Sequence, residues 1–203
     1  MRAWAARGKF IVFEGLNGSG CSTHSRLLAE FLRQRGHTVV LTAEPNPLGT
    51  NYIKIEEVLM GRKNTTPKYL QKLFIEDRKE HLKKIVIPAL AQGITVISDR
   101  YFFSTLAFGS IDIEPEWLMS ANKKFFVPDI SIIMSVPPEI CIARIQKSGD
   151  TKEIFDKLAK LKKAWETYES LPKIFPNVFV VDGTPPKSDV HHIITRIVMS
   201  KLL

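Results

Sequence analysis

The stretch Phe13-Glu14-Gly15-Leu16-Asn17-Gly18-Ser19-Gly20-Cys21-Ser22-Thr23 decides how this 203-residue chain folds. It has the frame of a phosphate-binding loop, G-x-x-x-x-G-K-[ST], with Cys21 in place of the usual lysine. An apolar run at residues 10–13 precedes the loop, and a segment with leucines at helical spacing, residues 22–35, follows it. A strand, a glycine-rich turn and a helix form the context in which such a loop binds phosphate.

The chemistry of the loop depends on its backbone more than on its lysine. Glycines permit the tight turn, while successive N–H groups and the helix dipole face the phosphates. Ser22 can still offer a hydroxyl to Mg²⁺, but the ammonium that spans the β- and γ-phosphates is absent. Loss of one such group costs about 10²- to 10³-fold in rate at comparable sites. Cys21 itself has two interpretations, a small buried residue or a thiol of lowered pKa at a helix N-terminus.

The composition, with 44% hydrophobic residues, predicts a single globular domain over residues 1–203, with residues 1–8 as an N-terminal extension. The net charge of +8 favours anionic partners, such as nucleotides, nucleic acid or an anionic membrane. Lysine pairs are spread along the chain, which favours solvated helix faces over a nucleic-acid groove.

Two cysteines fit neither a disulfide framework nor a metal cluster. With no segment apolar enough for a signal peptide or membrane span, we expect a soluble, cytoplasmic protein without nucleic-acid or membrane partners.

Apolar runs typical of strands alternate with helical patterns along the chain. This alternation predicts an α/β fold in which a parallel sheet carries helices on both faces. Ligands in such folds bind beyond the carboxyl ends of the strands. The predicted strands are residues 10–13, 38–41, 94–97, 130–134 and 178–181, and the predicted helices are 22–35, 51–60, 67–91, 102–109 with 114–124, 138–146, 152–171 and 188–202.

Two of these strand ends carry charged residues. Asp99 and Arg100 follow the third run, where a carboxylate suits Mg²⁺ and a guanidinium suits the forked binding of a phosphate. Alternatively, Asp99 caps the next helix and Arg100 pairs with a surface acid. Glu44 follows the second run and can be either a site residue or a loop acid.

A helical face in the middle of the chain can bind a base. Phe74 and Arg78 lie at positions i and i+4, so the ring can stack on a base while the guanidinium bonds to its edge. In the alternative, Phe74 belongs to the core and Arg78 pairs with Asp77 or Glu80.

Taken together, these features resemble the thymidylate kinase family of nucleoside-monophosphate kinases, from about residue 9 to the C-terminus. The resemblance implies a three-layer P-loop NTPase fold with a five-stranded parallel sheet and a short lid at about residues 147–153. It also implies Mg²⁺-dependent phosphoryl transfer from ATP to dTMP, giving dTDP and ADP, by a homodimer. The matching blocks are F-E-G-L-N-G-S-G-x-S-T, A-E-P, L-F-I-E-D-R-K-E-H with I-V-I-P-A-L, V-I-S-D-R-Y-F-F-S-T-L-A-F, P-D-I-S-I-I-M-S-V-P-P-E-I-C-I-A-R-I and V-D-G-T-P-P.

The resemblance also implies a role for each matching residue. ATP would bind to the loop from Gly15 to Thr23, with Arg144 over the adenine and Gly183 and Thr184 at its backbone edge. Ser22 and Asp99 would hold Mg²⁺ and, with Arg100, Lys147 and Lys152, form the catalytic set. The residues implied for dTMP are Asn17, Glu44, Phe74, Arg78, Arg100, Ser104 and Phe108.

The sequence departs from the family pattern at several cationic positions. Besides Cys21, Ala43 stands where many members have an arginine, Asn17 replaces an aspartate, and neither the loop nor the lid contains an arginine. In one interpretation, Lys147, Lys152 or Lys9 supplies the missing charge to a working kinase, although lysine lacks the planar fork of arginine. In the other, the protein acts only by binding nucleotides. The retained acceptor-side residues favour the kinase. Gly109, where relatives often carry a polar side chain, leaves the choice between dTMP and dUMP open.

Overall fold

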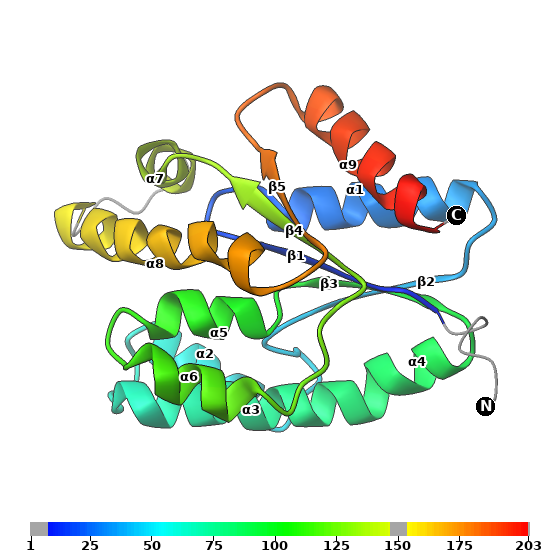
Figure 1. Cartoon of the computed structure of the whole chain (residues 1–203). Coiled ribbons are helices and arrows are strands. Elements are labelled where there is room, and N and C mark those ends of the chain that lie inside the picture. Colours follow the sequence, from blue (N-terminus) through cyan, green and yellow to red (C-terminus); the bar gives the residue numbers. More distant parts are fainter. Residues whose placement is uncertain (1–7, 147–153, 203) are drawn as a thin grey trace.

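The computed structural model describes residues 8–146 and 154–202, which form a five-stranded parallel sheet. The strand order is β2-β3-β1-β4-β5, and each strand lies on one of the predicted apolar runs (Figure 1). The strands are β1 (Phe10–Gly15), β2 (Val39–Ala43), β3 (Thr95–Asp99), β4 (Ile130–Ser135) and β5 (Val178–Asp182). Such buried parallel strands explain why the runs are almost continuously apolar.

Helices cover both faces of this sheet and give three layers, as predicted (Figure 1). One face packs against α1 (Cys21–Gln34) and α9 (Lys187–Leu202). The other packs against α4 (Ile87–Ala91), α5 (Phe102–Gly109) and α8 (Ile154–Ile174). The remaining helices pack on these or on one another: α2 (Tyr52–Leu59) on α3 (Pro67–His81), α3 and α6 (Pro115–Asn122) on α5, and α7 (Pro138–Gln146) on α8.

The long helix predicted at residues 67–91 is continuous but not uniform. A π-helical turn, Leu82–Val86, separates α3 from α4. Pro88 supplies the physical reason, because its ring leaves no N–H for the carbonyl one turn earlier and the helix widens there. The helix predicted at residues 152–171 corresponds to α8, which continues through Pro172 to Ile174.

The order of the strands places the ligand crevice at β1. This strand has β3 on one side and β4 on the other, so the chain reverses its direction of winding there. In open α/β sheets, ligands bind at the carboxyl side of this reversal. The loop at residues 16–20 leaves β1 at this point.

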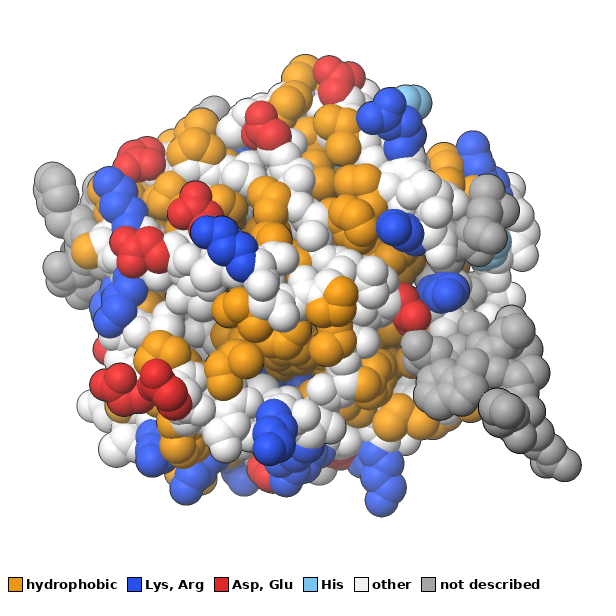
Figure 2. Space-filling view, viewed as in Figure 1, with side chains coloured by type: hydrophobic (Ala, Val, Ile, Leu, Met, Phe, Trp, Pro, Cys, Tyr) orange, Lys and Arg blue, Asp and Glu red, His pale blue; other side chains and the backbone are white. Residues whose placement is uncertain are grey.

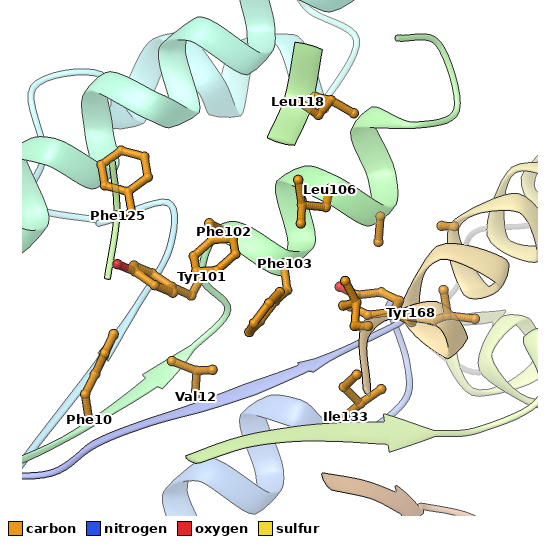
Figure 3. Close-up of a cluster of buried hydrophobic side chains, with 14 of the residues drawn as sticks. Phe10, Val12, Tyr101, Phe102, Phe103, Leu106, Leu118, Phe125, Ile133 and Tyr168 are labelled. Atoms are coloured by element: carbon orange, nitrogen blue, oxygen red, sulfur yellow. The ribbon is translucent and has the colours of Figure 1, made fainter. Parts of the chain in front are cut away.

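An aromatic cluster fixes the segment that follows β3. Tyr101 packs edge-on against Phe10, with ring centroids 5.0 Å apart, and Phe103 packs against Phe175 at 4.9 Å. Figure 3 shows Tyr101 between Phe10 and Phe125, at the start of α5. The cluster therefore holds the backbone on one side of Arg100.

The surface shows mixed charge on the face drawn in Figure 2, where basic and acidic side chains are interspersed with hydrophobic ones. The net charge of +8 is thus not gathered into one continuous basic surface on this face. Among the helices of the described residues, none has the length and apolar character needed to cross a membrane.

Candidate functional site

The loop after β1 adopts the backbone that its glycines predict. Gly15, Gly18 and Gly20 have φ values of 149°, 86° and 103°, a region that residues with a Cβ rarely occupy. A Cβ at Gly18 would also lie 2.6 Å from the carbonyl oxygen of Cys141 in α7. The loop leads directly into α1, whose first N–H groups have no partner within the helix. This arrangement forms an anion site at the positive end of the helix dipole.

A cavity of about 640 Å³ opens in front of this loop. Arg144 crosses it from α7 and donates hydrogen bonds to the carbonyl oxygens of Gly183 (3.0 Å) and Gly18 (3.4 Å). Thr184 does not line the cavity, because its N–H and hydroxyl both donate to Asp182 Oδ1. The lining residues outside Leu16–His24 are Arg100, Arg144, Gly183, Pro185 and Lys187.

Lys187 is a cation that the sequence interpretation missed. It begins α9 and lines the cavity in front of the loop. Its place directly after V-D-G-T-P-P, beyond the carboxyl end of the last strand, could have identified it.

Cys21 is a core residue. Its side chain is only 5% exposed and packs with Ile11, Phe13 and Leu28. Burial raises the pKa of the Cys21 thiol to about 12, although the nearby Arg100 opposes this shift. The interpretation as a thiol of lowered pKa is therefore wrong, and the interpretation as a small buried residue is confirmed.

Ser22 and Asp99 meet at the edge of the loop, as predicted. The Ser22 hydroxyl donates a hydrogen bond to Asp99 Oδ2. Within the described residues, the buried Asp99 Oδ1 has no hydrogen-bond partner. The alternative in which Asp99 caps the next helix is wrong, because Tyr101 is the N-cap of α5 and no side chain caps this helix.

These two oxygens fit a divalent cation. A carboxylate with a free, buried oxygen beside a serine hydroxyl offers the hard ligands that Mg²⁺ prefers. The described part of the chain holds no group of three or more His, Cys, Asp or Glu that could bind a metal. A cation at Asp99 would thus take further ligands from water and from substrate phosphates, as is usual for Mg²⁺.

Arg100 occupies the centre of the site. Its guanidinium donates to Asn17 Oδ1 (2.8 Å), to the carbonyl oxygen of Gly15 and to the hydroxyls of Ser104 (3.2 Å) and Tyr168 (3.3 Å). These partners replace the surface acid of the alternative interpretation. The residue has a φ of 77°, which is strained for a residue with a Cβ and is characteristic of functional positions.

A second cavity, of about 340 Å³, lies on the other side of Arg100. Its size suits a small-molecule ligand. Arg100 and Asn17 line both cavities, so the two meet at these side chains. Every residue expected to bind dTMP lines the second cavity, namely Asn17, Glu44, Phe74, Arg78, Arg100, Ser104 and Phe108.

Arg78 is held by a buried polar network. The side chain is 1% exposed, and it donates to Glu44 Oε2 (2.7 Å), Asn122 Oδ1 (2.8 Å) and Thr105 Oγ1 (3.0 Å). The other oxygen of Glu44 lies 3.1 Å from His81 Nδ1. Glu44, rather than Asp77 or Glu80, is thus the ionic partner of Arg78. The interpretations of Arg78 as a partner of Asp77 or Glu80, and of Glu44 as only a loop acid, are wrong.

Glu14 is a buried acid that the sequence interpretation missed. It accepts hydrogen bonds from the hydroxyls of Ser104 (2.6 Å) and Tyr168 (3.0 Å) and from the N–H of Tyr101 (2.8 Å). Burial raises the pKa of Glu14 to about 7, although the Arg100 charge and these hydrogen bonds oppose the shift. An acid inside the apolar run of β1 could have identified it, since a buried carboxyl group needs partners.

Glu14 should make stability fall as the pH rises. Its pKa is about 7 in the folded protein against an ordinary 4.5, so the folded state holds this proton more tightly. The stabilisation is complete below pH 4.5 and is lost as the pH rises through 7. Between pH 5 and 8, we expect the unfolding free energy of the wild type to fall by about 2 kcal/mol relative to Glu14→Gln. Urea unfolding at both pH values measures this difference.

A Glu169→Gln variant is the control, because this acid is exposed on the same helix as Tyr168. It should follow the wild type at both pH values. Parallel behaviour of Glu14→Gln and the wild type would instead show that Glu14 is ionised throughout this range.

The lysines expected to supply the missing charge have different outcomes. Lys147, Lys152 and the lid at residues 147–153 lie outside the described residues. Lys9 precedes β1, at the opposite end of that strand from the loop. The expectation that Lys9 supplies charge at the loop is therefore wrong.

Comparisons with known proteins agree with this geometry. The family model described as thymidylate kinase matches residues 13–194. The chain is 37% identical to the probable thymidylate kinase of Pyrococcus horikoshii, covering 97% of this chain and 98% of the relative. The thymidylate kinase of Desulfotalea psychrophila is 34% identical over 81% of this chain and 82% of its own. The chain belongs to the thymidylate kinase family.

Proposed function

We propose that the protein transfers the γ-phosphoryl group of ATP to dTMP, giving ADP and dTDP. One observation carries the proposal: Arg100 lies between the cavity in front of the phosphate-binding loop and the cavity lined by Phe74 and Arg78. A donor in the first cavity and an acceptor in the second would bring their phosphates together at this side chain. The printed names of the relatives support the same reaction.

The donor would bind through the loop. The backbone from Gly15 to Thr23 faces its phosphates, Arg144 packs over the adenine and Gly183 borders the base. Ser22 and Asp99 would hold Mg²⁺, which neutralises charge on the donor phosphates. Lys187 lines this cavity and adds a positive charge that the loop lacks at Cys21.

The acceptor would bind between α3 and α5. Phe74 stacks on the thymine, and Arg78 bonds to its edge with the two N–H groups that its buried network leaves over. Ser104, Phe108 and Asn17 surround the sugar and phosphate. Glu44 acts here through Arg78, which it holds in place.

No protein nucleophile is required for this reaction. The acceptor phosphate itself attacks, so the protein contributes positioning and charge. Arg100 can offer its fork to the acceptor phosphate at the point where the two cavities meet.

A coupled assay of ADP release tests the proposal, with Mg²⁺-ATP and dTMP as substrates. We expect turnover that depends on dTMP, on ATP and on Mg²⁺. If the protein binds dTMP but releases no ADP, it acts by binding alone and the proposed reaction is wrong.

Replacing Cys21 with lysine should raise the turnover rate. The backbone cradle of the loop is intact, and a lysine there would extend an ammonium toward the β- and γ-phosphates. We expect kcat to rise at least about 10-fold, which is part of the effect seen when one charged or hydrogen-bonding group is removed from a comparable site. Steady-state kinetics with Mg²⁺-ATP and dTMP measures the change.

The matched control is Cys21→Ser, which keeps the size of the side chain but adds no charge. Its kcat should stay within about threefold of the wild type. An unchanged rate in a well-folded Cys21→Lys variant would mean that other cations, such as Lys187, already supply the charge.

We also propose a cytoplasmic homodimer. Both cysteines are free, which suits a reducing compartment. Exposed hydrophobic residues on and beside α2, namely Ile53, Leu59 and Met60, suit an interface between two copies. Analytical ultracentrifugation and cell fractionation test the two statements.

A further inference from the structure

Gln71 belongs to the wall of the acceptor cavity and carries an unpaired hydrogen-bond acceptor. The residue lies on α3, is 6% exposed and lines the cavity. Its Oε1 is buried and has no hydrogen-bond partner within the described residues. A buried polar atom without a partner is costly, so it calls for an explanation. Because the residue lines the cavity, a small turn of its amide would let a ligand there provide the partner.

The position of Gln71 on α3 places it beside the two residues expected to hold the base. Gln71, Phe74 and Arg78 follow at i, i+3 and i+7, so all three share one face of the helix. A base stacked on Phe74 with its edge at Arg78 would therefore also pass Gln71.

The absence of a side chain at Gly109 leaves room for the Gln71 amide. A Cβ at this position would lie 3.4 Å from Gln71 Cδ and 2.7 Å from a methyl carbon of Leu118. A side chain at 109 would thus crowd the wall next to the glutamine. The wall next to Gly109 is therefore formed in part by the Gln71 side chain, which comes from α3.

Two other acceptor residues of the same wall, Glu44 and Thr105, are already engaged. Both Glu44 oxygens are occupied, one by Arg78 and one by His81. Thr105 Oγ1 also accepts from Arg78. Gln71 Oε1 is thus an acceptor left unpaired in the same cavity wall as Arg78, which has two N–H groups left over.

A donor and an acceptor in one cavity wall match one type of pyrimidine. Thymine and uracil present O4, an acceptor, next to N3–H, a donor, which complements Arg78 and Gln71 in that order. Cytosine presents the reverse, an amino donor next to an acceptor N3.

We propose that Gln71 recognises the base, with Oε1 accepting a hydrogen bond from N3–H and thereby selecting 4-oxo pyrimidines against cytosine. The inference rests on the proposed acceptor site. It adds a specificity residue to that site and explains the unpaired atom.

The test is calorimetric binding of dTMP and dCMP to the wild type and to Gln71→Met, which keeps the size of the side chain without the amide. We expect dTMP to bind the variant about 10-fold more weakly, the worth of one hydrogen bond, while dCMP binding changes less than about threefold. The melting temperature should stay or rise, because the variant removes a buried unpaired acceptor. Gln92→Met, at an exposed glutamine after α4, is the control and should change neither affinity.

Three results would overturn the proposal. Unchanged dTMP affinity in Gln71→Met would show that the amide makes no bond to the base. Equal weakening of dTMP and dCMP, with a lower melting temperature, would show that Gln71 only shapes the wall. Tighter binding of dCMP than dTMP by the wild type would mean that the amide offers its N–H instead. If the wild type binds neither nucleotide, the proposed function itself fails and this inference falls with it.

Discussion

Arg100→Lys should lower kcat/KM about 10²- to 10³-fold, the cost of removing one preorganised group that stabilises developing charge. Lysine keeps the positive charge and has the same backbone preferences as arginine, so the strained φ of 77° does not account for the expected loss. What it loses is the planar fork that donates to several oxygens at once. In the free protein that fork is already held by Asn17, Ser104 and Tyr168, so its position is fixed before substrate binds.

Steady-state kinetics for both substrates will measure the effect of Arg100→Lys. We expect the loss mainly in kcat, because the guanidinium lies where the two phosphates meet. Arg196→Lys, at an exposed position of α9, is the matched control and should behave as the wild type. A kcat/KM within threefold of the wild type would show that a single positive charge is sufficient at position 100.

Arg78→Met should destabilise the protein by about 3–5 kcal/mol. The variant removes the partner of Glu44 at a site that is almost completely buried and leaves the acceptors of Asn122 and Thr105 unpaired. A buried carboxylate left without its arginine, with only His81 beside it, is the main cost, more than the lost attraction itself. For a chain of this length, the melting temperature should fall by roughly 10 °C. Chemical denaturation at constant pH will measure the free energy directly.

The double variant Arg78→Met with Glu44→Gln separates the two contributions. Because the glutamine carries no charge, the double variant should recover a large part of the stability lost in Arg78→Met. If both variants are equally unstable, the loss comes from packing and the hydroxyl and amide acceptors rather than from the buried charge. Binding of dTMP should remain weak in both, since both lack the guanidinium.

The fold was predictable because its local patterns agree with one another. Each buried parallel strand requires an apolar run, and each crossover requires a helical segment, so alternation along the chain specifies the layers. The positions of the functional loop, Asp99 and Arg100 followed from the rule that ligands bind at the carboxyl ends of strands. The acceptor residues came from the resemblance, since Phe74 and Arg78 alone favoured a core residue and an ion pair over a base-binding face.

The features that the sequence did not reveal depend on contacts between distant residues. Glu14 meets Tyr168 across more than 150 positions, and neither residue type alone indicates that meeting. The partners of Arg78 likewise come from α5, α6 and the end of β2. Gln71, whose oxygen is unpaired within the described residues, lies beside Gly109 of another helix. Whether Cys21 is a small buried residue or a thiol of lowered pKa was likewise decided only by its neighbours.

The cavity that holds Phe74 and Arg78 is built from one uninterrupted part of the chain. Apart from Asn17, its described lining residues all fall between positions 44 and 112, whereas the phosphate-binding cavity draws on the loop, α7 and the segment that follows β5. Exchange of that single segment between homologous genes would therefore transplant nearly a whole base-binding pocket while leaving the loop, α7 and the segment after β5 in place, although Asp99 and Arg100 would move with the exchanged segment. Recombination can thus change what this scaffold phosphorylates in one step, which scattered point substitutions could reach only through several intermediates.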